Sequence, residues 1–133
     1  MNNNNTLIVG SIGLDTIETV SDRKESILGG SATYATIAAG KSASVHLVGI
    51  IGDDFPINGM KILEEATVDL SNLDQKEGKT FSWGGKYAED WDNRETLFTE
   101  LGVFNDFNPI LTDKNKEVPV IFLANIHPLL QLS

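Results

Sequence analysis

The sequence predicts an α/β fold, with a parallel sheet covered by helices and a small antiparallel β sheet at its edge. Strand-type and helix-type patterns alternate along residues 6–66, and this order is typical of an α/β layer. Residues 45–51 form a near-continuous apolar run, which is typical of a parallel strand covered on both faces. Residues 80–83 and 94–99 instead alternate polar and apolar side chains, which indicates an antiparallel hairpin with one face in water.

The first third of the chain predicts three strands and one helix. Residues 6–10 are a short apolar run, which predicts the first strand. Residues 17–20 and 25–28 predict two short strands around the polar turn Ser21-Asp22-Arg23-Lys24. Residues 31–39 are small and rich in alanine, and they predict a buried helix that ends at Gly40.

Later segments extend the same layer. After the strand at 45–51, the turn Gly52-Asp53-Asp54 leads into a helix that Asp54 caps and that ends near Ala66. Residues 68–73 predict a further strand of the sheet. Residues 118–124 have the pattern of another buried strand, and we expect that strand to leave an apolar sheet edge open.

Composition and charge exclude several classes of function. The 133 residues are the size of one domain, and the chain has no cysteine, which excludes disulfides and thiolate metal sites. The net charge is −9 and the ten Lys and Arg residues are scattered, so we expect no nucleic-acid partner. No apolar run approaches the ~20 residues of a membrane span, and Met1 is not followed by the regions of a signal peptide. We therefore expect no membrane partner and a cytoplasmic location.

The glycine pair Gly29-Gly30, at the start of the helix predicted over residues 31–39, is the strongest candidate for a binding site. Adjacent glycines let the backbone approach a ligand closely, and the start of the helix offers free N–H groups to polar ligand atoms. The pair is preceded by Asp15, which follows a buried-strand pattern. Asp15 is either a ligand-binding carboxylate or an ordinary turn acid, and the residue pattern favours neither.

Other polar and aromatic residues have two interpretations each. Asp53 and Asp54 resemble a pair of metal-binding carboxylates, but their position before a predicted helix favours the role of a helix N-cap. Trp83, Tyr87 and Trp91 are suited either to stacking on a sugar or base, or to packing against a second subunit.

The two histidines and the glycine-rich turn after the first strand favour structural roles. His46 lies inside a buried-strand pattern, and His127 stands next to Pro128 at a predicted helix start. Neither histidine has the partner spacing of a metal site. Gly10-Ser11-Ile12-Gly13 lacks the third glycine of a dinucleotide-binding motif and opens no helix, so that function is excluded.

Four motifs occur in order at residues 9–15, 29–34, 48–55 and 78–81, and the predicted hairpin follows them. Together they resemble the amino-terminal half of the PfkB (ribokinase-like) carbohydrate kinase family, which includes ribokinase, adenosine kinase and ketodeoxygluconate kinase. The resemblance implies that residues 1–133 are the amino-terminal part of one ribokinase-like domain. It also implies that two inserted segments, about 15–28 and 78–101, form a β lid over a bound sugar.

The resemblance assigns roles at the glycine pair. Asp15 would accept hydrogen bonds from sugar hydroxyls, for which a carboxylate has acceptor sites on both oxygens. Gly29 and Gly30 would form the hinge of the lid and the backbone that faces the sugar. Tyr34 stands where many members of the family carry an asparagine that contacts the sugar, so the contact at this position differs from the usual one.

Two residues of the lid hairpin complete the implied site. Tyr87 and Arg94 would project toward the substrate. The planar fork of Arg94 would pair with a carboxylate or phosphate of the substrate, whereas the residues alone favour a surface ion pair with Asp92 or Glu95.

The family reaction is the ATP-dependent phosphorylation of a sugar or nucleoside hydroxyl, and ATP and Mg²⁺ are expected for the full-length parent. Its catalytic base belongs to a later Gly-Ala-Gly-Asp type motif, which this sequence does not contain. We therefore expect the base beyond Ser133, no cofactor for this chain alone, and no turnover by it. The alternative is a non-enzymatic module that binds a ligand or forms homo-oligomers through the lid or the open sheet edge.

Overall fold

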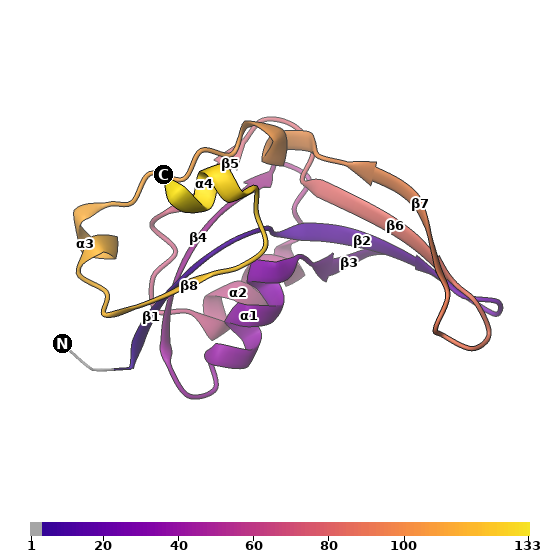
Figure 1. Ribbon diagram of the computed structural model, residues 1–133, viewed down its shortest axis with the longest axis horizontal. Coiled ribbons are helices and arrows are strands. Elements are labelled where there is room, and N and C mark those ends of the chain that lie inside the picture. Colours follow the sequence, from indigo (N-terminus) through magenta and orange to yellow (C-terminus); the bar gives the residue numbers. More distant parts are fainter. Residues whose placement is uncertain (1–3) are drawn as a thin grey trace.

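A computed structural model describes residues 4–133 as two four-stranded sheets, which form a helix-covered body and an arm that extends from it (Figure 1). The elements in chain order are β1 (Asn5–Val9), β2 (Gly13–Glu18), β3 (Arg23–Gly29), α1 (Ser31–Ala39), β4 (Ser44–Gly52), α2 (Ile57–Ala66), β5 (Leu73–Lys76), β6 (Phe81–Tyr87), β7 (Arg94–Glu100), η1 (Gly102–Asp106), α3 (Asp113–Lys116), β8 (Val120–Leu123) and α4 (Pro128–Leu132).

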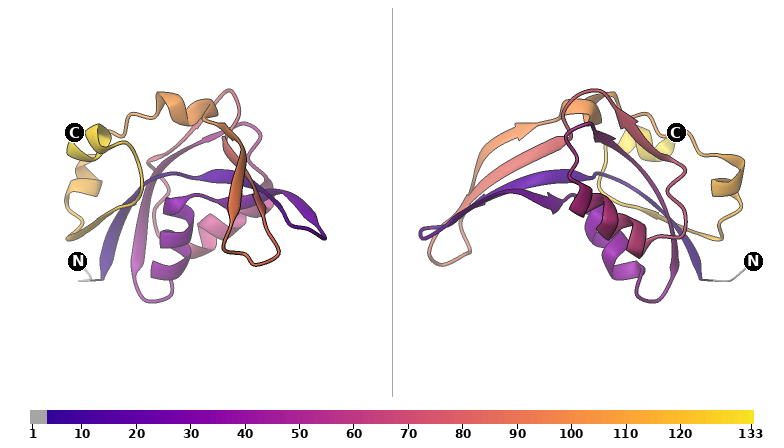
Figure 2. Two further views of the ribbon diagram at one scale, coloured as in Figure 1. Left: turned by 45° about the vertical axis from the view of Figure 1, so that its right-hand side comes forward. Right: turned by 180° about the vertical axis from the view of Figure 1, so that it is seen from behind.

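The body contains the parallel sheet, in the strand order β5-β4-β1-β8. α1 and α2 cover one face of this sheet, and η1 and the chain that follows it cover the other (Figure 2). β4 lies between β1 and β5, and its residues 45–52 are all buried, as the apolar run predicts. The predicted strands at 6–10 and 45–51 and the helix at 31–39 are confirmed.

Two apolar clusters hold the layers of the body together. One lies between the sheet and the two helices α1 and α2, and it contains Ile8, Ile12, Ala32, Val45, Leu47, Ile51 and Leu63. The other lies under η1 and the carboxyl-terminal segment, and it contains Leu7, Val9, Val48, Ile50, Val103, Phe107, Val118 and Ile126. Each cluster takes alternate residues of β1 and β4, because successive side chains of a strand point to opposite faces.

The second sheet, which we call the lid, has the strand order β3-β2-β6-β7. The pairs β2·β3 and β6·β7 are antiparallel hairpins, and the alternating patterns at 80–83 and 94–99 predict the second of them. The two hairpins join through β2 and β6, which run parallel. The fold class is therefore confirmed, but the lid sheet is mixed rather than purely antiparallel. The views of Figure 2 agree that the lid extends away from the body.

Three local predictions are wrong. The strand expected at 17–20 is β2, which begins at Gly13 and ends at Glu18. The strand expected at 68–73 is β5, which begins only at Leu73, and the earlier segment contributes one bridge, between Asp69 and His46. Asp54 does not cap α2, whose N-cap is Pro56 without any side-chain hydrogen bond. Tertiary contacts explain the difference, because Asp54 hydrogen-bonds the distant Thr80.

β8 is an exposed edge strand instead of a buried one. Among residues 4–133 it pairs only with β1, and its four residues Val120, Ile121, Phe122 and Leu123 are each about half exposed, at 47–52%. The apolar pattern of residues 118–124 therefore predicted the strand correctly but its burial wrongly. The expected open apolar edge of the parallel sheet is present.

Candidate functional site

Asp15 lies on the lid strand β2, with its carboxylate directly against the backbone of Gly29 on β3. A Cβ atom built on Gly29 would contact Asp15 Oδ2 and lie 2.7 Å from Asp15 Cγ. A residue with a side chain at position 29 would therefore displace the carboxylate. Partial burial raises the pKa of Asp15, because removal from water penalises the charged form. Within residues 4–133 no side chain or amide donates to this half-buried carboxylate, so it is suited to accept hydrogen bonds from a polar ligand.

Gly30 joins the lid to α1 in a conformation that requires glycine. Its φ is +96°, and a Cβ at this position would lie 2.8 Å from Ile12 Cα. The backbone of residues 30–31 is thereby pressed against the segment that leads from β1 into the lid. The glycine pair thus has two separate functions, since Gly29 makes room for Asp15 and Gly30 makes the turn into the helix.

Ser11 and Ser31 fasten the start of α1 to the end of β1. The Ser31 amide donates to Ser11 Oγ at 3.0 Å, the Ala32 amide donates to the Ser11 carbonyl at 2.9 Å, and the two serine hydroxyls lie 3.0 Å apart. The Ser31 hydroxyl also donates to the Asn125 carbonyl. We expected the first N–H groups of this helix to be free. This is wrong for Ser31 and Ala32, because Ser11 accepts a hydrogen bond from each of their amides.

Cross-strand pairing places Trp83 beside Asp15, and the side chain of Arg94 reaches from the tip of the lid to the Trp83 ring. Asp15 and Trp83 are register partners of the parallel strands β2 and β6, so their side chains share one face of the lid. The Arg94 guanidinium lies over the indole, with Cζ 5.1 Å from the ring centroid, an arrangement that contributes roughly 0.5–1 kcal/mol at an exposed site. Trp83 leans over Gly85, where a Cβ would lie 2.6 Å from Trp83 Cζ2.

Tyr87 and Arg94 are register partners at the far end of the lid hairpin. Tyr87 also packs against Trp91, at 5.5 Å between ring centroids. Both partners line a shallow pocket of about 320 Å³ at the tip of the lid, together with Val20, Lys86, Ala88, Asn93 and Glu95. The ion pair that the residues alone favour for Arg94 is not formed within residues 4–133, and the guanidinium lies over the Trp83 ring instead.

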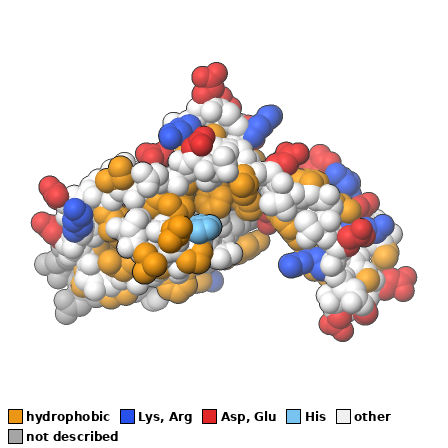
Figure 3. Space-filling view, turned by 45° about the horizontal axis from the view of Figure 1, so that its top comes forward, with side chains coloured by type: hydrophobic (Ala, Val, Ile, Leu, Met, Phe, Trp, Pro, Cys, Tyr) orange, Lys and Arg blue, Asp and Glu red, His pale blue; other side chains and the backbone are white. Residues whose placement is uncertain are grey.

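Tyr34 is on the first turns of α1 and is 58% exposed. Its hydroxyl makes no hydrogen bond in the described part of the chain, so it is available to a ligand but not held in place. Figure 3 shows the molecular surface hollowed between the body and the lid arm. The predicted residues thus separate into a group at the base of the lid, Asp15 with Gly29 and Gly30, and a pair at its tip, Tyr87 with Arg94.

Asp53 and Asp54 do not form a metal site. Asp54 Oδ1 accepts from the Thr80 amide at 2.8 Å and from the Thr80 hydroxyl at 2.6 Å, and Asp53 Oδ2 accepts from the Gly78 amide at 3.4 Å. Along residues 4–133, no three His, Cys, Asp or Glu side chains are grouped so that they could hold a metal ion. These residues therefore do not fit a Mg²⁺ site of their own, and the two aspartates instead fix the start of the lid hairpin.

His46 is a satisfied core histidine, as its strand pattern predicts. Its Nδ1 lies 3.2 Å from Asp69 Oδ2, and its Nε2 lies 2.9 Å from Asn5 Oδ1. Burial would raise the pKa of Asp69, but hydrogen bonds from Ser71 and His46 and the charge of Lys114 lower it to about 2. This network joins β1, β4 and the segment before β5, and it plays a structural part. His127 is the N-cap of α4, as its position beside Pro128 predicts.

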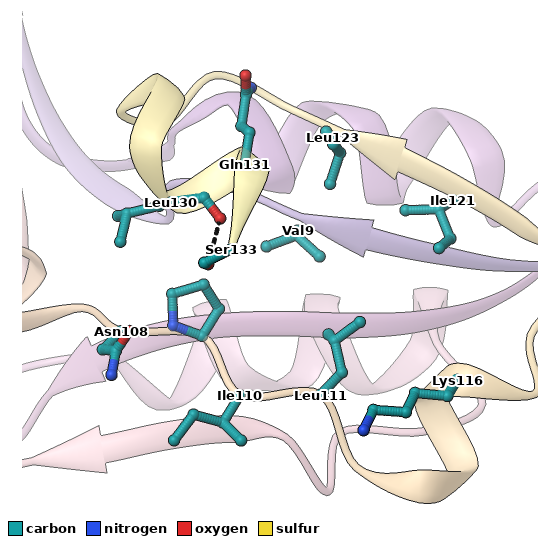
Figure 4. Close-up of a pocket in the computed structure, with 11 residues that line it drawn as sticks. Val9, Asn108, Ile110, Leu111, Lys116, Ile121, Leu123, Leu130, Gln131 and Ser133 are labelled. Atoms are coloured by element: carbon teal, nitrogen blue, oxygen red, sulfur yellow. Dashed lines mark hydrogen bonds between the residues drawn. The ribbon is translucent and has the colours of Figure 1, made fainter.

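A groove of about 460 Å³ lies on the other side of the body, between β8, the loop before α3, and α4 (Figure 4). Val9, Ile121 and Leu123 line it from the strands, and Leu111 and Leu130 line it from the segments that flank them. None of the predicted site residues lines this groove. It continues the apolar surface of the β8 edge.

Sequence reasoning missed Ser11, Gly85 and the stacking of Arg94 on Trp83. The Ser11–Ser31 hydrogen bonds and the Trp83–Arg94 contact join residues that are 20 and 11 positions apart, so no local pattern indicates them. The Gly84-Gly85 pair next to a tryptophan was the one available signal, because glycine in a strand often marks a close approach.

The described residues include no helix long and apolar enough to cross a membrane. No protein-family model and no curated protein matches the chain. Solved structures do match it. A ribokinase from Cryptococcus neoformans var. grubii serotype A in complex with ADP superimposes with a TM-score of 0.75 at 20% identity, over 92% of this chain and 41% of that one.

Two nucleoside kinases are also similar. The enzyme from Methanocaldococcus jannaschii, described as an archaeal member of the ribokinase family, gives a TM-score of 0.69 at 17% identity, over 90% of this chain and 44% of its own. The enzyme from Burkholderia thailandensis in complex with inosine gives 0.60 at 16% identity, over 73% and 37% of the two chains. This chain spans about two fifths of the length of the kinases it matches. It therefore has a ribokinase-like fold, in the part of those kinases to which it corresponds.

Proposed function

We propose that this chain is the substrate-binding part of an ATP-dependent kinase that phosphorylates a hydroxyl of a sugar or nucleoside. In this proposal residues 1–133 are the amino-terminal part of one ribokinase-like domain, and the segments about 15–28 and 78–101 are the lid. The likeness to a ribokinase and to nucleoside kinases supports the proposal. We also propose a cytoplasmic location, where such a reaction has its ATP.

The observation that carries the proposal is the Asp15 carboxylate seated against Gly29 at the base of the lid. Its oxygens offer several acceptor sites, and neighbouring hydroxyls of a sugar are donors at a matching spacing. Hydrogen bonds to a charged acceptor are shorter and stronger than neutral ones. The carboxylate therefore both binds the substrate and selects the face of the sugar that is presented.

The other residues of the proposed site orient the bound substrate. Gly29 and Gly30 keep the backbone close enough for the sugar to approach it, and the fixed turn at Gly30 sets the direction in which the lid leaves the body. Tyr34 offers its exposed hydroxyl from α1, and Tyr87 and Arg94 approach from the lid. Closure of the lid over the substrate would exclude water from the hydroxyl that reacts.

ATP supplies the phosphoryl group in the parent reaction, and Mg²⁺ accompanies its phosphates. The residues described above bind and orient the acceptor, and we assign no catalytic base among them. We therefore propose that these 133 residues bind substrate without phosphorylating it. Incubation of the purified chain with ATP, Mg²⁺ and a bound sugar should release no ADP, and sustained release by a kinase-free preparation would contradict this.

Calorimetric titration with pentoses, hexoses, sugar acids and nucleosides tests the binding proposal. We expect at least one class to bind, and Asp15→Asn to weaken that binding tenfold or more, since a charge-assisted hydrogen bond contributes about 1.5–3 kcal/mol. Asp22→Asn, in the exposed turn of the same hairpin, is the matched control and should bind like the wild type. Failure of every class to bind would contradict the proposed function.

The exposed β8 edge supports a second candidate function, in which two copies of the chain associate. Its four apolar residues are about half exposed, and the backbone groups on its outer side face no strand among residues 4–133. Two such strands can pair antiparallel across a twofold axis, which satisfies both edges at once. Sedimentation over a range of concentrations should reveal a dimer that Ile121→Lys weakens. A wild-type monomer at every concentration would exclude this function.

A further inference from the structure

The outer edge of β8 has backbone groups that point away from the sheet at every second residue. The Ala124 amide donates to the Val9 carbonyl of β1 at 2.8 Å. Successive residues of a strand turn their N–H and C=O groups to opposite sides, so Phe122 also turns its groups toward β1. The N–H and C=O groups of Ile121 and Leu123 therefore point to the open side, where no strand lies among residues 4–133.

Both faces of this edge are apolar and free of charge. Ile121 and Leu123 line the groove on the side of η1 (Figure 4), and Val120 and Phe122 alternate with them toward the side of α1. No residue from 118 to 126 is charged, so two copies can meet here although each carries a net charge of −9.

The apolar surface at this edge is large enough to contribute to a stable interface. The four half-exposed side chains of β8 leave on the order of 400 Å² per copy to be buried, whereas a standard interface takes roughly 800 Å² from each partner. Ile110, Leu129 and Leu132 are exposed on the segments that border the groove, and they extend the same surface.

The symmetry of two identical edges limits how they can pair. Antiparallel pairing places the twofold axis perpendicular to the sheet, so the same faces of both copies lie on the same side. Residues directly opposite each other in the pair share a face. A residue on the groove side of one β8 must therefore be opposite a residue on the groove side of the other.

Two of the registers that meet this condition leave backbone groups without a partner. If Ile121 is opposite itself, Leu123 is opposite Pro119, which has no N–H to donate. If Leu123 is opposite itself, Ile121 is opposite Asn125, whose carbonyl already accepts from the Ser31 hydroxyl. The register between these two, with Phe122 opposite itself, has neither defect.

We propose that two copies of the chain associate through β8 in this register, with Phe122 of both copies on the twofold axis. Ile121 of each copy exchanges two backbone hydrogen bonds with Leu123 of the other, which satisfies all four free groups of each edge. The two Phe122 residues form a non-hydrogen-bonded pair, in which opposite side chains are closest. The two grooves meet across the axis, because Ile121 and Leu123 line them. This inference rests on the second candidate function above, since it needs two copies that associate.

Single cysteines test the register, because the chain has no cysteine of its own. Opposite residues of a non-hydrogen-bonded pair have Cα atoms about 4.5 Å apart, which is within the range of a disulfide. Phe122→Cys should therefore form a disulfide-linked dimer under mild oxidation at least tenfold faster than Ile121→Cys. The two copies of residue 121 are offset by two positions along the strands, beyond the ~7 Å that a disulfide spans. Non-reducing electrophoresis measures both rates, at concentrations at which sedimentation shows the wild-type dimer.

A second measurement keeps Phe122 in place, since its replacement removes the ring from the axis. A mixture of Ile121→Cys and Leu123→Cys copies should form the mixed disulfide-linked dimer at least tenfold faster than either variant links to itself, because the two residues are opposite each other. Val68→Cys is the matched control for random collision. It is exposed in the segment before β5, at the opposite edge of the sheet, and should give the slowest linking.

The outcomes distinguish the register from the association itself. Fastest linking by Ile121→Cys alone or by Leu123→Cys alone would show one of the other two registers and overturn the proposal. A wild-type dimer whose β8 variants link no faster than Val68→Cys would place the interface elsewhere, which also overturns it. If the wild type is a monomer at every concentration, the second candidate function fails together with this inference.

Discussion

Replacement of Gly29 by alanine tests whether the glycine exists to seat the Asp15 carboxylate. The new Cβ would lie 2.7 Å from Asp15 Cγ, well inside van der Waals contact. Overpacking of this kind costs roughly 1–3 kcal/mol, and we take about 1.5 because the carboxylate can rotate away. Alanine also restricts the unfolded chain, which returns about 0.5 kcal/mol. Gly29→Ala should therefore destabilise the fold by about 1 kcal/mol, or about 4 °C in Tm.

The double variant isolates the contact. In an Asp15→Ala background the collision is absent, so Gly29→Ala should stabilise the fold by about 0.5 kcal/mol, and the coupling between the two sites is about 1.5 kcal/mol. Urea unfolding followed by circular dichroism measures all four corners of the cycle. An equal cost of Gly29→Ala in both backgrounds would refute the reasoning, because the two residues would then not be in contact.

Substrate binding gives an independent reading of the same variant. The displaced carboxylate should lose its hydrogen bonds to the sugar, so Gly29→Ala should weaken binding tenfold or more although the protein stays folded. Gly30→Ala should act differently, since its cost comes from a backbone with φ of +96° and falls on stability. If the Gly29→Ala protein binds sugar as tightly as the wild type does, Asp15 is not part of the binding site.

Three further predictions concern the pH dependence of Asp69 and Asp15 and the hydrogen bonds of the buried Thr80 hydroxyl. The pKa of Asp69 is lowered to about 2 from an ordinary value of 3.8, so this carboxylate contributes stability, on the order of 2 kcal/mol, that is complete above about pH 5 and is lost as the pH falls through 2. Asp69→Asn should remove this part of an acid unfolding curve. Because burial raises the pKa of Asp15, sugar affinity measured by calorimetry should fall with pH while the pH is still above its ordinary pKa, and constant affinity down to that value would contradict a role for the carboxylate. Thr80→Val, which removes the hydroxyl that bonds Gly52 and Asp54, should cost roughly 2–4 kcal/mol in urea unfolding, whereas the exposed Thr96→Val should cost less than about 0.5.

Local sequence patterns predicted most of the secondary structure because they depend on short-range periodicity. The apolar run at 45–51 and the alanine-rich segment at 31–39 specify a strand and a helix wherever the rest of the chain lies. The segment at 68–73 was misjudged for the same reason, since Leu70 packs against the helix-covered cluster from a loop, and the strand begins only at Leu73.

The candidate site was predicted in its residues but not in its arrangement. Asp15 and the glycine pair were identified from their order, yet the contact between the Asp15 carboxylate and Gly29 depends on how β2 and β3 are paired. The role of Arg94 changed most. Its acidic neighbours in sequence indicated an ion pair, whereas in the folded chain its guanidinium lies over the ring of Trp83, 11 positions away.

The sequence by itself determined the elements, the fold class and the resemblance to ribokinase-like kinases, because each follows from local periodicity or from motifs in a fixed order. Only the tertiary structure decided that the lid is a mixed sheet, that Ser11 accepts hydrogen bonds from the first N–H groups of α1, and that β8 is exposed. These properties are set by which strands lie side by side and in what register. Strand order and register are those that minimise the free energy of the whole chain, so they cannot be inferred from any one segment of the sequence.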